Sequence, residues 1–242
     1  MQKHVYFPTC TKPCPPAKII SGSFPALTII VLHMKISIFG STGQTGQELI
    51  KQGLKKGYSI STIVRNEPDI TNPNLTVIKG NIFDKKLVKD TIDKSDLVIS
   101  VMAFTPKLFG QKSTELYSKT ASVLAEAMTE LNLKKLAFCT SAGVEEDPNE
   151  IWFYKHILKP FYLSKGYKDM QLAEKIISNS TLDWILVRPS RLTNAALTTQ
   201  FRISQRFRPK EGSSISRADL AFFILNQLNS SDWVHKTPTL AY

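Results

Sequence analysis

Met34-Lys-Ile-Ser-Ile-Phe-Gly-Ser-Thr-Gly-Gln-Thr-Gly46 is the stretch that decides the fold of this 242-residue chain. Its first half has the apolar content of a short buried strand. Its second half places Gly40, Gly43 and Gly46 at G-x-x-G-x-x-G spacing, and an amphipathic helix is predicted directly afterwards, over residues 47–56. A strand joined to a helix by a glycine-rich turn is typical of a dinucleotide-binding site.

Each glycine of this turn has its own physical task. The first permits a tight turn, the second lets a pyrophosphate approach the backbone, and the third lets the helix pack closely on the strand. Glycines also occur in turns for structural reasons alone. A second strand predicted over residues 59–64 completes a βαβ unit, however, and this context favours the nucleotide reading. We therefore expect the dinucleotide to contact Gly40, Ser41, Thr42, Gly43, Gln44, Thr45 and Gly46.

The rest of the chain alternates apolar strand patterns with amphipathic helix patterns. Such alternation predicts an α/β fold, a Rossmann-type doubly wound parallel sheet flanked by helices, with residues 34–242 as its single domain. Further strands are predicted over 75–79, 96–102, 135–140 and 183–188, and further helices over 84–94, 114–131, 169–179 and 217–228, the last capped by Ser216. A hairpin is predicted around residues 202–210.

Residues 1–33 do not share this periodicity, because five prolines interrupt them. They lack the uninterrupted apolar core of a secretory signal. We expect them to be a disordered or non-native extension, with Met34 as the natural start. Cys10 and Cys14 have no histidine at a useful spacing, so no metal site is expected there.

The remaining cysteine, Cys139, lies in an apolar run that looks like a buried strand. Three cysteines do not form a disulfide framework, which favours a reducing, cytoplasmic location. No run in the sequence approaches the roughly 18 consecutive apolar residues of a membrane span.

The chain is basic, with 31 Lys and Arg against 20 Asp and Glu, a net charge of +11. Three of the lysines and no acid lie in residues 1–33, which leaves +8 on residues 34–242. The basic residues are spread along the chain and no nucleic-acid module is visible, so a nucleic acid partner is not expected. The charge fits either a positive field that attracts an anionic cofactor or substrate, or a solvated basic surface.

Arg65 follows the second predicted strand, where a site selective for NAD usually has Asp or Glu against the ribose 2′-hydroxyl. A guanidinium there can pair with a 2′-phosphate and stack on adenine. Arg65 therefore favours NADP(H) as the cofactor, the alternative being an exposed loop arginine.

Groups just beyond the carboxyl ends of the other strands face the ligand in such sheets. Asn81 and Ile82, after the third strand, are expected to flank the adenine. The middle of the dinucleotide is expected to pass the end of the fourth strand, and the site to close after the sixth. The residues at these two places are Met102, Ala103 and Phe104, and Pro189 with the three residues that follow it.

Residues 145–166 combine aromatic and basic side chains, among them Trp152, Tyr154 and Lys155. The segment fits either a lid over a planar substrate or a segment that packs into the core. His156 within it fits a surface or capping position better than a catalytic one.

With the 40–46 turn, Arg65, Thr140-Ser141-Ala142 and Val187-Arg188-Pro189 in order, residues 34–242 resemble the atypical short-chain dehydrogenases of the NmrA-like type. Within that group the chain looks most like the biliverdin-IXβ reductase and flavin reductase family, which also has a C-terminal tyrosine, here Tyr242. The resemblance implies an NADPH-dependent reductase of flavins and related planar acceptors.

The resemblance also implies which residues lie at the reacting end. In that family the serine after the fifth strand lies beside the nicotinamide, and Ser141 matches it. A histidine two residues after the proline that ends strand six is replaced here by Arg191. Ser141 and Arg191 are therefore the expected catalytic residues.

Ordinary short-chain dehydrogenases use a Tyr-x-x-x-Lys pair, in which the lysine lowers the tyrosine pKa. No tyrosine of this chain has lysine at that spacing. An isoalloxazine or tetrapyrrole can take its proton from solvent, so the protein's task would be to orient the cofactor against such an acceptor. The alternatives are a non-catalytic NADP-binding redox sensor and, with less support, a nucleotide-sugar epimerase, which needs the missing pair.

Overall fold

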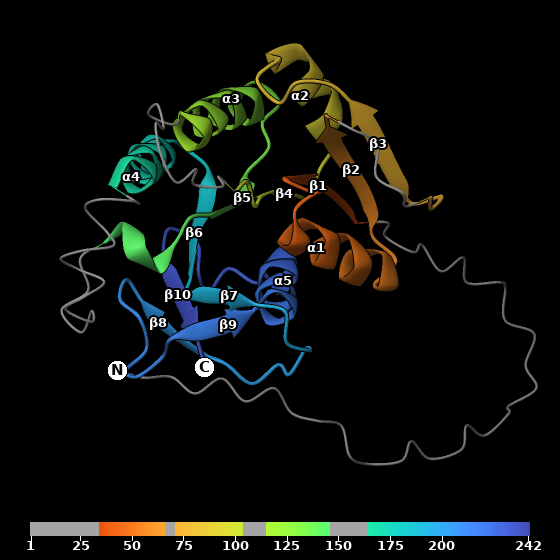
Figure 1. The fold of residues 1–242 in the computed structure, drawn as a ribbon. Helices are drawn as coiled ribbons and strands as arrows, with labels where there is room; N and C mark the ends of the chain where they lie inside the picture. The colour runs from red at the N-terminus through yellow and green to blue at the C-terminus, as the bar shows by residue number, and fades with distance from the viewer. Residues whose placement is uncertain (1–33, 66–70, 104–114, 146–163) are drawn as a thin grey trace, which may run out of the picture.

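The computed structural model describes residues 34–65, 71–103, 115–145 and 164–242 (Figure 1). Several predictions therefore lie outside the described residues: the extension over 1–33, Phe104, and most of the aromatic and basic stretch, with His156. Among the helices that the structure describes, none combines the length and the apolar character needed to cross a bilayer.

An eight-stranded sheet in the order β3-β2-β1-β4-β5-β6-β10-β8 forms the centre of the molecule. All neighbouring strands run parallel except β8, which is antiparallel to β10. The predicted doubly wound parallel sheet is thus confirmed. The strands are β1 Lys35–Phe39, β2 Ser59–Val64, β3 Leu75–Lys79, β4 Leu97–Ser100, β5 Lys135–Cys139, β6 Asp183–Pro189, β8 Arg202–Gln205 and β10 Pro238–Ala241.

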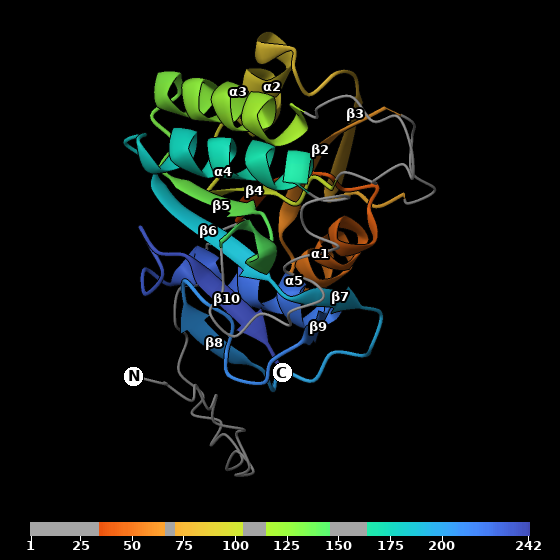
Figure 2. The ribbon, with the colours of Figure 1, turned by 60° about the vertical axis from the view of Figure 1, so that its left-hand side comes forward.

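Helices cover both faces of this sheet, as Figures 1 and 2 show. One face packs against α1 (Gln44–Lys55) and α5 (Arg217–Asn226), and the other against α2 (Lys85–Ile92), α3 (Leu116–Glu130) and α4 (Ser164–Ser178). Each strand therefore contributes side chains to two cores. In β1, Ile36 and Ile38 face α1 while Phe39 faces the α2–α3 side. This double burial explains why β4 is apolar at nearly every position.

The order of the strands along the chain reverses at β1, with β2 and β3 on one side of it and β4, β5 and β6 on the other. That strand pairs with β2 on one side and with β4 on the other, in parallel register. Chain connections leave β1 and β4 toward opposite faces, which opens a crevice beyond the carboxyl ends of these strands. The predicted ligand edge of the sheet is therefore this one.

Side chains cap the N-termini of α2 and α5. The Asp84 carboxylate accepts hydrogen bonds from the backbone N–H groups of Lys86 and Leu87 at 3.0 and 3.2 Å. Ser216 accepts from the Asp219 N–H at 2.9 Å, which confirms the predicted cap of α5.

The structure corrects some of the predicted elements. Helix α1 begins at Gln44, three residues before its predicted start, so the end of the glycine turn is already helical. The hairpin predicted around 202–210 is wrong, because β8 pairs with β10 more than 30 residues later in the chain. A second, two-stranded parallel sheet of β7 (Arg191–Thr193) and β9 (Ser214–Ser216) was not predicted. Strands of three residues carry too little periodicity to be recognised.

Candidate functional site

The glycine turn after β1 forms a cradle that side chains cannot enter. Gly40 has φ +90°, and a Cβ there would lie 2.7 Å from the Val101 carbonyl oxygen. A Cβ on Gly46 would lie 2.5 Å from the Ser41 Cα. Both distances are too short for a methyl group, so two of the three glycines are required by close backbone approach.

The N-terminus of α1 opens onto this cradle without a competing group. Gly43 is its N-cap, no side chain caps it, and its first turn holds no acid. Thr42, Gly43 and Gln44 are exposed there. The backbone N–H groups and the positive end of the helix dipole can therefore hold a pyrophosphate.

Ser41 turns inward rather than toward the opening. It is 3% exposed, and its hydroxyl lies 2.6 Å from that of Thr62 on β2, which also donates to the Ile38 carbonyl at 2.7 Å. This contact fixes the turn against the sheet. Ser41 can thus offer its backbone to a phosphate, while its hydroxyl is already hydrogen-bonded to Thr62.

The other predicted cofactor residues that the structure describes follow the carboxyl ends of neighbouring strands. Arg65 is exposed directly after β2, and Asn81 and Ile82 follow β3. The Asn81 side-chain oxygen accepts from the Phe83 N–H at 3.0 Å. Beyond β4, Met102 packs against the core on the α3 side and Ala103 is exposed.

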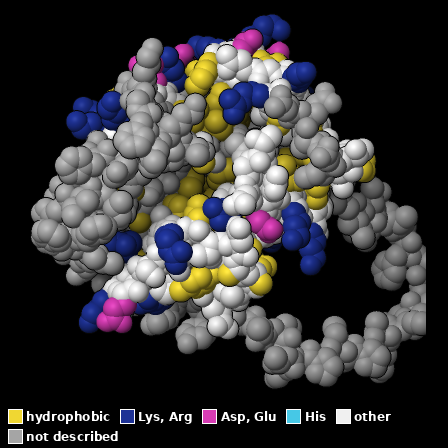
Figure 3. Space-filling view, viewed as in Figure 1, with side chains coloured by type: hydrophobic (Ala, Val, Ile, Leu, Met, Phe, Trp, Pro, Cys, Tyr) yellow, Lys and Arg dark blue, Asp and Glu magenta, His cyan; other side chains and the backbone are white. Residues whose placement is uncertain are grey.

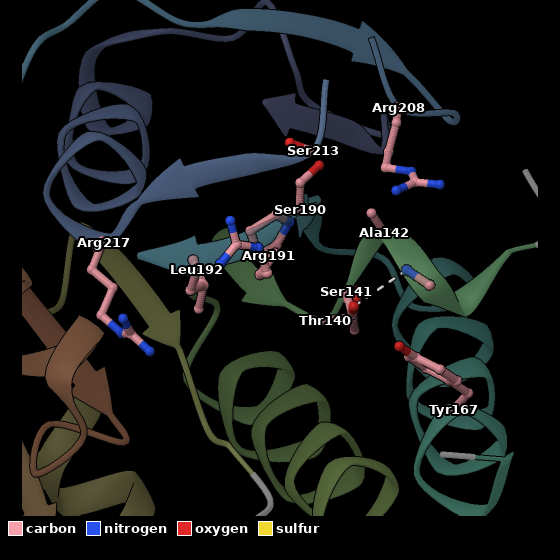
Figure 4. Close-up of a pocket in the computed structure, with 12 residues that line it drawn as sticks. Thr140, Ser141, Ala142, Tyr167, Ser190, Arg191, Leu192, Arg208, Ser213 and Arg217 are labelled. Atoms are coloured by element: carbon pink, nitrogen blue, oxygen red, sulfur yellow. Dashed lines mark hydrogen bonds between the residues drawn. The ribbon is translucent and has the colours of Figure 1, made fainter. Parts of the chain in front are cut away.

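A cavity of about 560 Å³ lies at the ends of β5 and β6 (Figure 4). It brings together Ser141 and Arg191, the expected catalytic residues, and Pro189, at which the site is expected to close. The space-filling view shows this side of the molecule hollowed, with apolar side chains in the hollow and Lys and Arg at its lower rim (Figure 3). The residues that complete the lining are Thr140, Ala142, Gly143, Tyr167, Ser190, Leu192, Arg208, Ser213 and Arg217.

Ser141 is held at the start of a short 3-10 helix, Ala142–Val144. Its Oγ accepts from the Gly143 N–H at 3.2 Å. A Cβ on Gly143 would lie 2.5 Å from Cζ of Tyr167, so the phenol ring of α4 packs directly on this turn. Figure 4 shows the Tyr167 hydroxyl pointing toward Ser141.

A buried ion pair supports the turn from behind. Arg188 of β6 donates from Nε and Nη2 to the two carboxylate oxygens of Glu174 on α4, at 3.0 and 2.6 Å, and from Nη1 to Glu145 at 2.6 Å. Glu174 also accepts from the Thr140 hydroxyl at 2.6 Å. Thr140, the residue before Ser141, is therefore tied to α4 through Glu174 and to β6 through its backbone N–H, which donates to the Val187 carbonyl at 2.9 Å.

These contacts shift the pKa values of Arg188 and Glu145. Burial alone would lower the pKa of Arg188, but its hydrogen bonds with Glu174 and Glu145 outweigh that and raise it. Burial raises the pKa of Glu145, while hydrogen bonds from Arg188 and Arg206 outweigh this effect and lower it. Arg188 and Glu145 therefore both stay charged at neutral pH.

Tyr167, Arg208 and Arg217 are among the cavity residues that sequence reasoning did not assign to the site. Tyr167 has Gln171 four residues later, so it fails the Tyr-x-x-x-Lys rule, yet it lies in the cavity with Ser141. Its place near the start of the helix after the serine strand is a signal that could have found it. The two arginines come from segments far apart in the sequence, and no local pattern joins them.

Arg217 lines two cavities. Besides the Ser141 cavity, it lines a second one, of about 230 Å³, together with Gln44 and Gln47 at the N-terminal end of α1. Its Nη1 donates to the Asn194 side-chain oxygen at 2.6 Å. The cavity at the N-terminal end of α1 and the Ser141 cavity thus share Arg217 as a lining residue.

Comparison with known proteins identifies the family of this sequence. The sequence model of the NAD(P)H-binding family matches residues 40–231, from the glycine turn to beyond α5. The chain belongs to this NAD(P)H-binding family. The predicted nicotinamide dinucleotide cofactor is confirmed at that level.

Known proteins resemble this NAD(P)H-binding chain in sequence or in fold. The uncharacterized protein YwnB from Bacillus subtilis is 22% identical over 203 residues, which cover 81% of this chain and 92% of that protein. Among solved structures, the oxidoreductase ylbE from Lactococcus lactis has a TM-score of 0.71 at 18% identity, covering 86% and 90% of the two chains. A short-chain dehydrogenase/reductase from Veillonella parvula in complex with NADP has a TM-score of 0.70 at 17% identity, covering 86% and 94%.

Proposed function

We propose that this chain is an NADPH-dependent oxidoreductase that transfers hydride to a planar acceptor, such as a flavin, a biliverdin-like tetrapyrrole or a quinone. The observation that carries the proposal is the position of Arg217, which lines both the cavity beside the phosphate cradle and the cavity that holds Ser141. A dinucleotide laid across the cradle would bring its nicotinamide to Ser141 and Pro189. The remaining space of the Ser141 cavity is then available to the acceptor.

The glycine turn suits such a cofactor, because Gly40 and Gly46 let it pack closely on the backbone and the N-terminus of α1 that follows has no side-chain cap. Arg65 would pair with the 2′-phosphate, and Asn81 and Ile82 would flank the adenine. Ala103, with Met102 and Phe104, would line the middle of the dinucleotide. When bound, NADPH supplies the hydride, and the chain orients it and excludes competing geometries. The NADP bound to the fold relative from Veillonella parvula is consistent with this choice of dinucleotide.

The absence of the Tyr-x-x-x-Lys pair favours acceptors that need little acid from the enzyme. Tyr167 lies in the cavity, but the residue four positions later is the neutral Gln171, whose Nε2 donates to the Val144 carbonyl at 2.8 Å. The lysine of ordinary short-chain dehydrogenases thus has no counterpart at this position. The buried thiol of Cys139 fits the reducing, cytoplasmic location that forms part of the proposal.

An acceptor screen tests the proposal. NADPH oxidation would be followed by absorbance with riboflavin, FMN, quinones and biliverdin, and at least one should be reduced with turnover. No turnover with any of them would refute the proposal, and tight NADPH binding without turnover would favour the redox sensor instead.

The choice of NADPH over NADH is tested with Arg65→Ala. Loss of a charge-assisted hydrogen bond of about 1.5–3 kcal/mol should weaken NADPH binding and leave NADH binding nearly unchanged. Lys55→Ala is the matched control, because it removes an exposed positive charge at the far end of α1. Equal losses for the two dinucleotides in Arg65→Ala would refute the 2′-phosphate role.

A further inference from the structure

Several of the side chains that line the Ser141 cavity are positively charged. Three of its lining residues are arginines, Arg191 at the start of β7, Arg208 after β8 and Arg217 at the start of α5, and none of the lining residues that the structure describes is acidic. Figure 4 shows Arg217 and Arg208 on opposite sides of Arg191. Like charges placed together repel each other, so a site of this kind is stabilised by an anion.

Arg191 differs from the structural arginines of the chain. Arg188 is buried and doubly paired with Glu174, and Arg202 donates to the carbonyl oxygens of Lys210 and Tyr242. The Arg191 guanidinium has no acceptor among the described residues, whereas its backbone N–H donates to the Ser213 carbonyl at 3.3 Å. It is an exposed cation facing the cavity, with its hydrogen-bonding groups available.

Ser190, next to Arg191, gives an independent indication of a ligand. The residue is 7% exposed and lines the cavity, yet its Oγ has no hydrogen-bond partner among the described residues. Its backbone N–H is satisfied by the Leu240 carbonyl at 3.0 Å, so the segment is well fixed. A buried hydroxyl without a partner costs about 1–3 kcal/mol, which an oxygen atom of a bound ligand would offset.

We propose that the Ser141 cavity selects acceptors that carry an anionic group, a phosphate or a carboxylate, and that Arg191 with Ser190 binds this group. Arg208 and Arg217 add to the positive field from either side. This inference rests on the proposed reductase function and names its substrate class. A guanidinium offers two parallel N–H groups, which match two oxygens of a phosphate or carboxylate.

Two matched ligand pairs test the proposal and distinguish the two anions. FMN and riboflavin share the isoalloxazine ring and differ in the phosphate; biliverdin and its dimethyl ester differ in the charged carboxylates. Binding would be measured by isothermal titration calorimetry with NADP⁺ present, so that it does not depend on turnover. The charged member of at least one pair should bind roughly 10- to 100-fold more tightly, the range of a charge-assisted hydrogen bond.

The variant Arg191→Ala should remove most of that preference by weakening the charged ligand alone. Arg191→Lys keeps the charge but loses the two parallel N–H donors of the guanidinium, so it should retain part of the preference for the charged ligand. Lys55→Ala again serves as the control and should leave both members of each pair unchanged. The affinity for the charged ligand should also fall as salt is added, while that for its neutral partner stays constant.

Equal affinity for charged and neutral ligands would overturn the proposal, as would an equal loss of both in Arg191→Ala, since that would indicate a packing role. A charge preference that depends on Arg191 but comes without turnover of any acceptor would support the anion site and refute the reductase function. The two proposals can therefore fail separately.

Discussion

The buried ion pair of Arg188 and Glu174 gives the sharpest stability prediction. The two side chains are 8% and 9% exposed. In Arg188→Met, Glu174 loses two hydrogen bonds and keeps one, from the Thr140 hydroxyl. Removing one partner of a buried pair costs about 3–5 kcal/mol, because the remaining charge is left in a poorly solvated place. We expect a loss of this size in the free energy of unfolding, measured by urea unfolding followed by circular dichroism.

Two further variants make the test specific. Lys86→Met breaks an ion pair with Asp90 whose side chains are 89% and 62% exposed, and it should cost less than about 0.5 kcal/mol. The double variant Arg188→Met with Glu174→Met leaves no unpaired carboxylate, so it should regain much of the lost stability. A cost below about 1 kcal/mol for Arg188→Met, or a double variant less stable than the single one, would refute the reasoning.

Three other predictions concern the cradle, the acidic side chains and the thiol. Gly46→Ala should lower the free energy of unfolding by about 1–3 kcal/mol and weaken NADPH binding, since its methyl would strike the backbone at Ser41. The structural control is Gly43→Ala, whose Cβ would make a single tight contact, 3.3 Å from the Gly40 carbonyl oxygen, and should cost less; equal stability of the two would contradict the prediction. The pKa values of Glu145 and Asp219 are lowered from 4.5 and 3.8, for Asp219 because hydrogen bonds from Tyr242, Thr199, Ser216 and Thr198 outweigh burial. Their contribution to stability is therefore complete above about pH 5 and is lost as the pH falls below 4; urea titrations between pH 3 and 7 that show no such decline would contradict it. Burial raises the pKa of Cys139 to about 12, so peptide-level mass spectrometry should find it unlabelled by iodoacetamide at pH 8 in the folded protein and labelled in urea.

The sequence was sufficient where one local pattern determines one element. The apolar runs of β1 and β4, the glycine turn and the Ser216 cap could all be predicted, because their physical causes lie within a few residues. The same holds for the edge of the sheet at which Arg65 and Ser141 lie, since parallel strands bring their carboxyl ends to one edge.

The contacts that could not be predicted depend on residues far apart in the sequence. Arg188 stood in a recognisable Val-Arg-Pro motif, but only the fold shows that its partners are Glu145 and Glu174 rather than a ligand. The position of β10 between β6 and β8 is also a tertiary outcome, because nothing in its four residues indicates which strands they will pair with. Tyr167 lies in the site because α4 packs on the 142–144 turn, a contact that no local pattern indicates.

The placement of β10 has a consequence for how the protein is made. Strand β8 sits at the sheet edge, paired with β10 among the described strands, and Arg206 just after it is tied to Thr237 by its backbone N–H. During synthesis on the ribosome, β8 can therefore pair into the sheet only after the residues of β10 have been made. The wall that carries Arg208 therefore forms later than the glycine turn of residues 40–46, which emerges about 200 residues earlier.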